Sequence, residues 1–285
     1  MLVQIETVSA LRQWLEASPV SPTHDVRWRG LVPTMGALHA GHAELIRLAR
    51  AECGGVVVSI FVNPLQFDKP DDLARYPRTL EADLAICRDL GVDVVFTPSQ
   101  AEVYPQSPEC FVDVGRLADH LCGKFRPGHF RGVATVVLKF LQMVQPHRAY
   151  FGQKDAQQLA IVKRLVSDFN VPVTIVEVPT VREPDGLAMS SRNRHLSVAE
   201  RASATALYQA LLEAQRLIAS GERDTALIKA RAALNVTQSD ALKLEYLEIV
   251  DPATMQPVDR VSGAVRIAGA MWVGSTRLID NVLAE

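Results

Sequence analysis

The segment with the clearest chemical potential is Pro33-Thr34-Met35-Gly36-Ala37-Leu38-His39-Ala40-Gly41-His42. It follows an apolar stretch and opens a helical pattern. The N–H groups and positive dipole end of a helix N-terminus favour phosphate, and Gly36 and Gly41 let a ligand approach the backbone. His39 and His42 would share one face of the first turn and donate hydrogen bonds to phosphate oxygens. The alternative, a turn with two surface histidines, is disfavoured by the strand–glycine–helix context.

A second segment, Ser59 to Phe67, ends an apolar stretch at Asn63-Pro64 and carries Gln66. An uncharged amide can donate to a carboxylate or hydroxyl and accept from a hydroxyl. Gln66 would therefore orient a hydroxy acid without neutralising a carboxylate that must stay nucleophilic. A solvent-facing glutamine in a turn explains the segment equally well.

A third segment, Phe151 to Gln158, also follows a short apolar stretch and precedes a helical pattern. Lys154 would neutralise phosphate as a point charge. Asp155 would accept a hydrogen bond from a ribose hydroxyl, cap the following helix, or do both. Gln158 lies one helical turn beyond Lys154 and would face the same ligand. The alternative is an exposed Lys154 beside a capping Asp155.

Two further segments combine glycine with basic or hydroxyl groups. In the loop from Val181 to Asn193, the hydroxyls of Ser190 and Ser191 and the planar guanidinium of Arg192 suit a triphosphate. A polar linker is the alternative for this loop. In residues 126–133, Arg126 and His129 would either complete an anion site or only decorate the start of a helix.

Apolar strands alternate with amphipathic helices over the first 180 residues. We expect strands at 26–32, 56–62, 92–96, 149–151 and 171–178, and helices near 8–15 and at 42–52, 80–90, 133–144 and 157–169. Strands that are apolar on both faces favour a parallel sheet within an α/β domain. Ligands of such sheets bind at the carboxyl ends of the strands, near a topological switch point.

The remaining chain predicts a smaller α+β domain. We expect helices at 197–219 and 224–238 and strands at 242–250, 265–273 and 277–279, with no crossover helix between these strands. The fold class is therefore α/β, with a Rossmann-like parallel-sheet domain at 1–180 and a C-terminal α+β domain at 181–285. The first loop of the second domain, 181–193, is expected to close on a bound nucleotide.

Composition excludes several classes of partner. The 285 residues are 48% hydrophobic, and the formal net charge of −2 gives no bulk attraction for nucleic acid. The cysteines at 53, 87, 110 and 122 form no C-x-x-C pair, so reduced thiols in a cytoplasmic protein are expected. The N-terminus lacks a signal-peptide pattern, and the apolar run 56–62 is shorter than the ~20 residues that span a bilayer, so no membrane partner is expected.

The histidine segment resembles the H-x-G-H signature of the nucleotidyltransferase and class I aminoacyl-tRNA synthetase superfamily. Over about residues 20–200 the chain resembles the pantothenate synthetase family, in the order and nearly in the spacing of PTMGALHAGH, SIFVNPLQF, YPRTLEADL, RPGHFRGV, FGQKDAQQL and VPTVREPDGLAMSSRN. The resemblance implies a Rossmann-like homodimeric ligase. It would join pantoate and β-alanine through pantoyl adenylate, with ATP as co-substrate and Mg²⁺ bound without an assigned metal residue.

The resemblance also implies a role for each matched residue. ATP would contact Met35, Gly36, Ala37, Leu38, His39, Ala40, Gly41, His42, Gly152, Gln153, Lys154, Asp155, Val181, Met189, Ser190, Ser191 and Arg192. The substrate residues would be Gln66, Gln158, Arg126 and His129, with Gln66 also beside β-alanine. The catalytic groups, which spread developing negative charge, would be His39, His42, Lys154 and Arg192. His42 fills the position of the proton donor.

Two departures from the family pattern are Gln153, where many members have Glu, and Ala156, where many have Tyr. Neither position needs a charge in the implied mechanism. Two other functions remain open. A simple nucleotidyltransferase shares the histidine motif but leaves the two glutamine segments without a role. A catalytically silent nucleotide-binding module would be free to lose His42, Lys154, Gln158 and Arg192, so their joint presence disfavours it.

Overall fold

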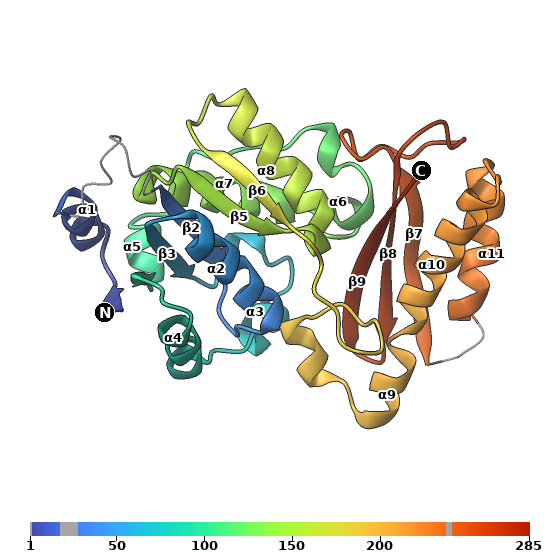
Figure 1. The fold of residues 1–285 in the computed structure, drawn as a ribbon, viewed down its shortest axis with the longest axis horizontal. Helices are drawn as coiled ribbons and strands as arrows, with labels where there is room; N and C mark the ends of the chain where they lie inside the picture. Colours follow the sequence, from blue (N-terminus) through green and yellow to red (C-terminus); the bar gives the residue numbers. More distant parts are fainter. Residues whose placement is uncertain (1, 18–27, 238–240) are drawn as a thin grey trace. The chain divides into compact units, whose positions relative to one another are not determined.

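The computed structural model describes residues 2–17, 28–237 and 241–285 (Figure 1). The strands are β1 (Val3–Ile5), β2 (Arg29–Thr34), β3 (Gly55–Ile60), β4 (Val94–Phe96), β5 (Arg148–Gly152), β6 (Thr174–Val178), β7 (Leu242–Val250), β8 (Val265–Val273) and β9 (Thr276–Ala284). The helices are α1 (Val8–Ala17), α2 (Ala40–Glu52), α3 (Pro70–Arg75), α4 (Leu80–Asp89), α5 (Gln100–Val103), α6 (Leu121–Phe125), α7 (His129–Val144), α8 (Ala156–Asp168), α9 (Val198–Ser203), α10 (Ala206–Ala219) and α11 (Thr225–Thr237). Short 3-10 helices lie at Pro64–Gln66, Arg116–Ala118, Gln153–Asp155 and Ser191–His195.

The first sheet is parallel, with the strand order β1-β4-β3-β2-β5-β6 over the described residues. From β2 the chain proceeds to β3 and β4 on one side, and then returns to the other side of β2 through β5 and β6. The order therefore reverses between β2 and β5, where Leu31 pairs with Ala149. This is the switch point of a doubly wound sheet, so a ligand is expected where these two strands end.

Helices cover both faces of this sheet (Figure 1). On one face, buried side chains of α2 and α4, such as Ile46 and Cys87, pack against Val58 in one apolar cluster. On the other, the Phe140 ring of α7 meets Phe61 and Phe96 edge-on, with ring centroids 5.9 and 6.1 Å away. Burial on both faces explains why the strands are apolar throughout.

The second sheet is antiparallel, with the order β7-β8-β9. Apolar residues of α10 and α11, including Ile218 and Ile228, pack with Leu247 and Ile267 on one face of it. At Gly269 a methyl group would lie 2.6 Å from Leu207 of α10, so glycine permits this close approach of helix and sheet.

The α/β class with a smaller α+β part is confirmed, and several boundaries are corrected. The predicted helix 197–219 is two helices, α9 and α10, and the strand predicted at 277–279 runs from 276 to 284. The strand predicted at 171–178 begins at 174, and α7 begins at 129 rather than 133. Residues 26, 27 and 238, which belong to a predicted strand and helix, lie outside the described residues.

The chain divides into two compact units, one comprising 1–114, 128–153 and 161–179, the other 115–127, 154–160 and 180–285. The change near 179 lies close to the boundary expected from the sequence, but two earlier segments group with the C-terminal residues. Among the helices of residues 2–17, 28–237 and 241–285, none has the length and apolarity needed to cross a membrane.

Candidate active site

The loop after β2 is held in shape by one buried carboxylate. Gly36 and Ala37 adopt left-handed backbone conformations, with φ of 81° and 51°. Asp83 of α4 is 1% exposed, and it accepts the backbone N–H groups of Ala37 at 3.0 Å and Leu38 at 2.8 Å. A left-handed alanine costs roughly 1–2 kcal/mol, so Asp83 supplies a specific reason for the loop to keep this form.

His39 and His42 are positioned by the start of α2. His39 is the N-cap, and its Nδ1 accepts the N–H of Gly41 at 3.1 Å. The Nδ1 of His42 accepts the N–H of His39 at 3.3 Å, and the ring centroids are 4.1 Å apart. Because both Nδ1 atoms are acceptors, each neutral ring carries its proton on Nε2. The expected shared face is therefore present, with Nε2–H as the donor of each ring.

The loop after β3 brings Gln66 to the same region. Gln66 is 8% exposed, which is inconsistent with a solvent-facing turn residue. Its Oε1 accepts from Nδ2 of Asn63 at 3.0 Å, and its Nε2 donates to Sδ of Met35 at 3.1 Å. Nδ1 of His129 donates to the Gln66 carbonyl at 2.7 Å. Unit 1 thus brings together Met35, Gln66 and His129 from three predicted segments.

Asn63 has a central part in fixing this loop. Besides Gln66, its Nδ2 donates to the Gly132 carbonyl at 3.1 Å, and its Oδ1 accepts from the Tyr104 hydroxyl at 3.0 Å. Burial raises the pKa of Tyr104 well above its usual range, so the phenol stays a neutral donor. Gly132 also has no room for a side chain, because a methyl group there would lie 2.2 Å from the Leu65 carbonyl oxygen.

Gly152 is the last residue of β5, at the switch point, and Gln153 follows it. Gln153 donates through Nε2 to Glu177 of β6 at 3.4 Å, and Lys163 pairs with the other oxygen of that carboxylate. A glutamate at 153 would place two carboxylates side by side. The glutamine therefore suits its neighbours in this chain.

The other predicted residues of this group lie in unit 2. Lys154 has a 19% exposed side chain with its Nζ 4.0 Å from the Asp155 carboxylate, and its backbone oxygen accepts from Asn281 of β9. Gln158 is half-buried in α8, whereas its neighbour Gln157 is buried and donates to the carbonyls of Leu117 and His120. Arg126, at the end of α6, also belongs to this unit.

The loop 181–193 is a folded structure within unit 2. Met189 donates its N–H to the Val181 carbonyl at 3.0 Å, and Arg182 bridges to Ala188. Ser190 caps the following 3-10 helix by accepting the N–H of Arg192 at 3.3 Å, while Ser191 is buried. This organised backbone contradicts an unstructured polar linker.

The predicted site residues thus form two sets, one in each unit. Sequence reasoning missed four residues that hold these sets in shape, namely Asn63, Asp83, Asp280 and Asn281. Asn63 and Asp83 stand inside the motifs SIFVNPLQF and YPRTLEADL, so their place beside the site residues was the available signal.

The family resemblance implies a magnesium ion, which needs oxygen ligands. Within the described residues no group of three or more His, Cys, Asp or Glu side chains could hold a metal. Mg²⁺ commonly keeps several waters and binds through substrate phosphates and one or two carboxylates. The half-exposed carboxylate of Asp155, 4.0 Å from Nζ of Lys154, would suit that mode as a protein ligand.

These features define a class: a Rossmann-like α/β protein whose helix α2 begins with an imidazole pair beside the switch point. The family model for pantoate–β-alanine ligase matches residues 3–283. The chain belongs to the pantoate–β-alanine ligase family.

Individual relatives cover nearly all of the chain. It is 48% identical to the pantothenate synthetase of Thermotoga petrophila over 98% of both proteins. It is 56% identical to a bifunctional pantoate ligase/cytidylate kinase of Thermosynechococcus vestitus over 90% of this chain and 50% of the relative. The chain thus spans about half the length of the bifunctional relatives that it matches.

Two solved structures resemble the whole chain. The Thermus thermophilus pantothenate synthetase shares 44% identity with a TM-score of 0.91, covering 99% of each chain. The Francisella tularensis pantoate–β-alanine ligase, complexed with β-γ ATP and β-alanine, shares 34% identity with a TM-score of 0.81, covering 99% of this chain and 98% of that one.

Proposed function

We propose that this chain is an ATP-dependent ligase that joins pantoate and β-alanine to form pantothenate, a precursor of coenzyme A. AMP and diphosphate are released, and pantoyl adenylate is the intermediate. The observation that carries the proposal is the pair of Nε2–H imidazoles at the start of α2, beside the switch point, in a chain of this family. The Francisella relative, complexed with β-γ ATP and β-alanine, supports the choice of ligands.

In the first step, a pantoate carboxylate oxygen attacks the α-phosphorus of ATP, and the bond to diphosphate breaks. Negative charge grows on the phosphate oxygens during this step. The Nε2–H groups of His39 and His42 donate to those oxygens, and Lys154 and Arg192 add positive charge. A single preorganised donor of this kind is worth about 3–4 kcal/mol in a transition state. Asp155 would help to hold Mg²⁺, which when bound would supply further charge neutralisation on the phosphates.

In the second step, the amine of β-alanine attacks the acyl carbon of the adenylate, and AMP leaves. Gln66 and Gln158 hold pantoate, and Gln66 also borders the amine. The Nε2 of Gln66 donates to a thioether sulfur, which is a weak acceptor. Exchange of that partner for a pantoate carboxylate or hydroxyl would strengthen the bond. Arg126 and His129 lie near the substrates in this proposal.

The proposal also covers the roles of the two domains, the cellular location and the oligomeric state. Residues 1–180 act as the ATP- and pantoate-binding domain, and 181–285 as a smaller domain whose loop 181–193 closes over ATP. The residues that contact ATP are those of 35–42, 152–155, 181 and 189–192. The protein acts in the cytoplasm as a homodimer.

If loop 181–193 closes, ATP should protect it from limited proteolysis, and equal cleavage with and without ATP contradicts closure.

Substrate-dependence separates the ligase from its alternatives. Incubation with ATP and pantoate should release diphosphate, and AMP should appear only after β-alanine is added. A simple nucleotidyltransferase would leave the nucleotide on its product, so addition of the amine would release no AMP. ATP binding without diphosphate release would instead indicate a silent module.

His42 provides the direct test of the chemical step. His42→Ala should slow formation of the adenylate at least about 100-fold, on the scale of one lost transition-state donor. Single-turnover diphosphate release with ATP and pantoate measures this step without the amine. A rate near that of the unmodified protein would refute the role.

A further inference from the structure

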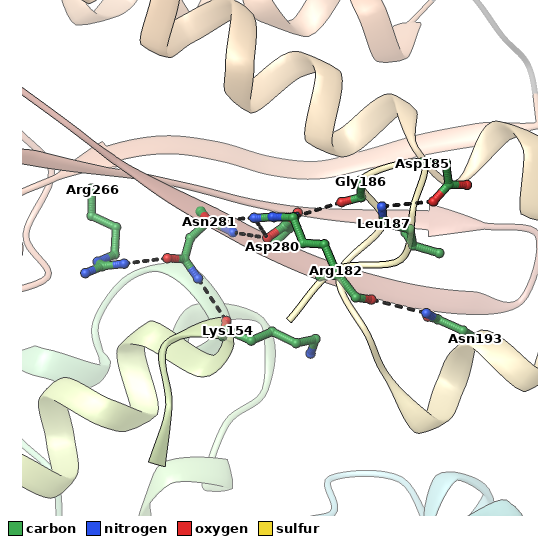
Figure 2. A network of polar contacts seen from close by, with 10 residues as sticks. Lys154, Arg182, Asp185, Gly186, Leu187, Asn193, Arg266, Asp280 and Asn281 are labelled. Atoms are coloured by element: carbon green, nitrogen blue, oxygen red, sulfur yellow. Dashed lines mark hydrogen bonds and ion pairs between the residues drawn. The ribbon is translucent and has the colours of Figure 1, made fainter. Parts of the chain in front are cut away.

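Two consecutive residues of β9 contact the two segments of unit 2 that carry family-implied ATP residues, Asn281 at Lys154 and Asp280 at Arg182 (Figure 2). Asp280 and Asn281 are buried, with exposures of 5% and 6%. Polar side chains in a strand interior are costly unless they are hydrogen-bonded. Their partners therefore indicate what these two residues do.

Asn281 holds the backbone of Lys154. Its Nδ2 donates to the Lys154 carbonyl at 2.9 Å, and its Oδ1 accepts from Arg266 of β8. Both ends of the amide are thus used, so its orientation is fixed. The bond holds the backbone of Lys154 at a defined point on β9.

Asp280 holds the loop that carries Arg192. It pairs with Arg182 through two bonds of 2.6 and 3.0 Å. Arg182 also donates to the Gly186 carbonyl at 3.0 Å, and its guanidinium lies 3.8 Å from the ring centroid of Tyr208. Successive strand residues point to opposite faces, so one dipeptide reaches two loops from the two faces of the sheet.

We propose that Asp280 and Asn281 are positioning residues for nucleotide binding: Asn281 sets the backbone of Lys154, and Asp280, through Arg182, sets the loop that ends in Arg192. This inference rests on the proposed function. It assigns to β9, which carries none of the ATP residues implied by the family, the task of fixing the spacing between an ammonium and a guanidinium that serve one triphosphate.

Asn281→Asp isolates the first contact. Aspartate has the same size and retains an acceptor for Arg266, but it cannot donate to the Lys154 carbonyl. The dissociation constant of α,β-methylene-ATP, measured by calorimetry, should rise about tenfold, as for the loss of one productive hydrogen bond. Gln256→Glu is the matched control, because Gln256 Nε2 donates to the Arg116 carbonyl at 2.7 Å in the same unit without contacting either loop.

A double-mutant cycle tells positioning from general destabilisation. If Asn281 acts through Lys154, Asn281→Asp should weaken analogue binding less than about twofold in a Lys154→Ala background. Arg182→Lys, which keeps the charge but loses the two-bond geometry, should likewise lose its effect in an Arg192→Ala background. Full additivity in both cycles, or unchanged affinity in Asn281→Asp, would overturn the inference.

The two proposals fail in different ways. Analogue binding that responds to Asn281→Asp, without diphosphate release from ATP and pantoate, overturns the ligase function and keeps the positioning role. Absence of analogue binding by the unmodified protein overturns both.

Discussion

The carboxylate of Asp83 offers the sharpest test of how the histidine loop is built. In the wild-type protein, the N–H groups of Ala37 and Leu38 donate to different oxygens of the Asp83 carboxylate. In Asp83→Asn the amide oxygen can accept one of these two N–H groups, and the NH₂ group faces the other without forming a hydrogen bond. Hydrogen bonds to charged groups contribute about 1.5–3 kcal/mol each. If this loss weakens the complex with ATP, the apparent second-order rate constant of adenylate formation with respect to ATP should drop about 10- to 150-fold. The range follows from about 1.4 kcal/mol per tenfold change.

The assay is single-turnover diphosphate release at several ATP concentrations, with thermal unfolding measured in parallel. Asp93→Asn is the matched control, because Asp93 also accepts a backbone N–H, from Val56 at 2.8 Å, and pairs with Arg50 at 2.6 Å, but it precedes β4 at the opposite end of the sheet. The control should lose stability with unchanged kinetics. A folded Asp83→Asn protein with unaltered ATP dependence would refute the argument.

Three other changes test separate parts of the structure. A glycine-to-alanine change in a helix ordinarily stabilises it by about 1 kcal/mol, but in Gly132→Ala the contact with Leu65 should lower the melting temperature and raise KM for pantoate. The control is Gly115→Ala, where the added methyl group would meet open space. A higher melting temperature of Gly132→Ala would contradict the close packing at Leu65. Ellman's reagent should titrate one thiol in the native protein and none in Cys110→Ser, because the other three cysteines are buried. Burial and, to a smaller extent, the negative charge of Asp83 also raise the pKa of Cys87 to about 12. A second fast-reacting thiol would contradict the burial of these cysteines. Burial and, to a smaller extent, the positive charge of Arg29 lower the pKa of His147 below its ordinary 6.5. The unfolded state therefore binds the proton more readily, and the free energy of unfolding should fall as the pH drops below the ordinary pKa of histidine. Denaturation of His147→Asn should show a smaller fall, and an equal fall would exclude His147 as its source.

Strands of the first sheet were predictable because burial on both faces leaves an unbroken apolar run. β2, β3 and β5 were each expected within a few residues of where they lie. β1, with three residues, is too short for its pattern to be recognised. The break between α9 and α10 has no glycine or proline to announce it, since Ala204 at the junction is fully buried and packing decides the bend there.

The strand β9 shows why part of the site could not be found from the sequence. Asp280 and Asn281 are typical of turns, so the predicted strand ended at 279. In the structure they continue the strand, because Arg182 and the Lys154 carbonyl satisfy them from about 100 residues away or more. Asp83 was missed for a similar reason: an acidic residue early in a helix usually needs no partner beyond the helix itself.

The capping geometry of His39 and His42 has one more consequence. Each Nδ1 receives a backbone N–H, so a proton added there would confront an existing donor and expel it. A ring that carried its proton on Nδ1 would therefore lose its bond to the backbone at the start of α2. Conversely, the start of the helix fixes the tautomer: as long as this turn is helical, each neutral imidazole keeps its hydrogen on Nε2.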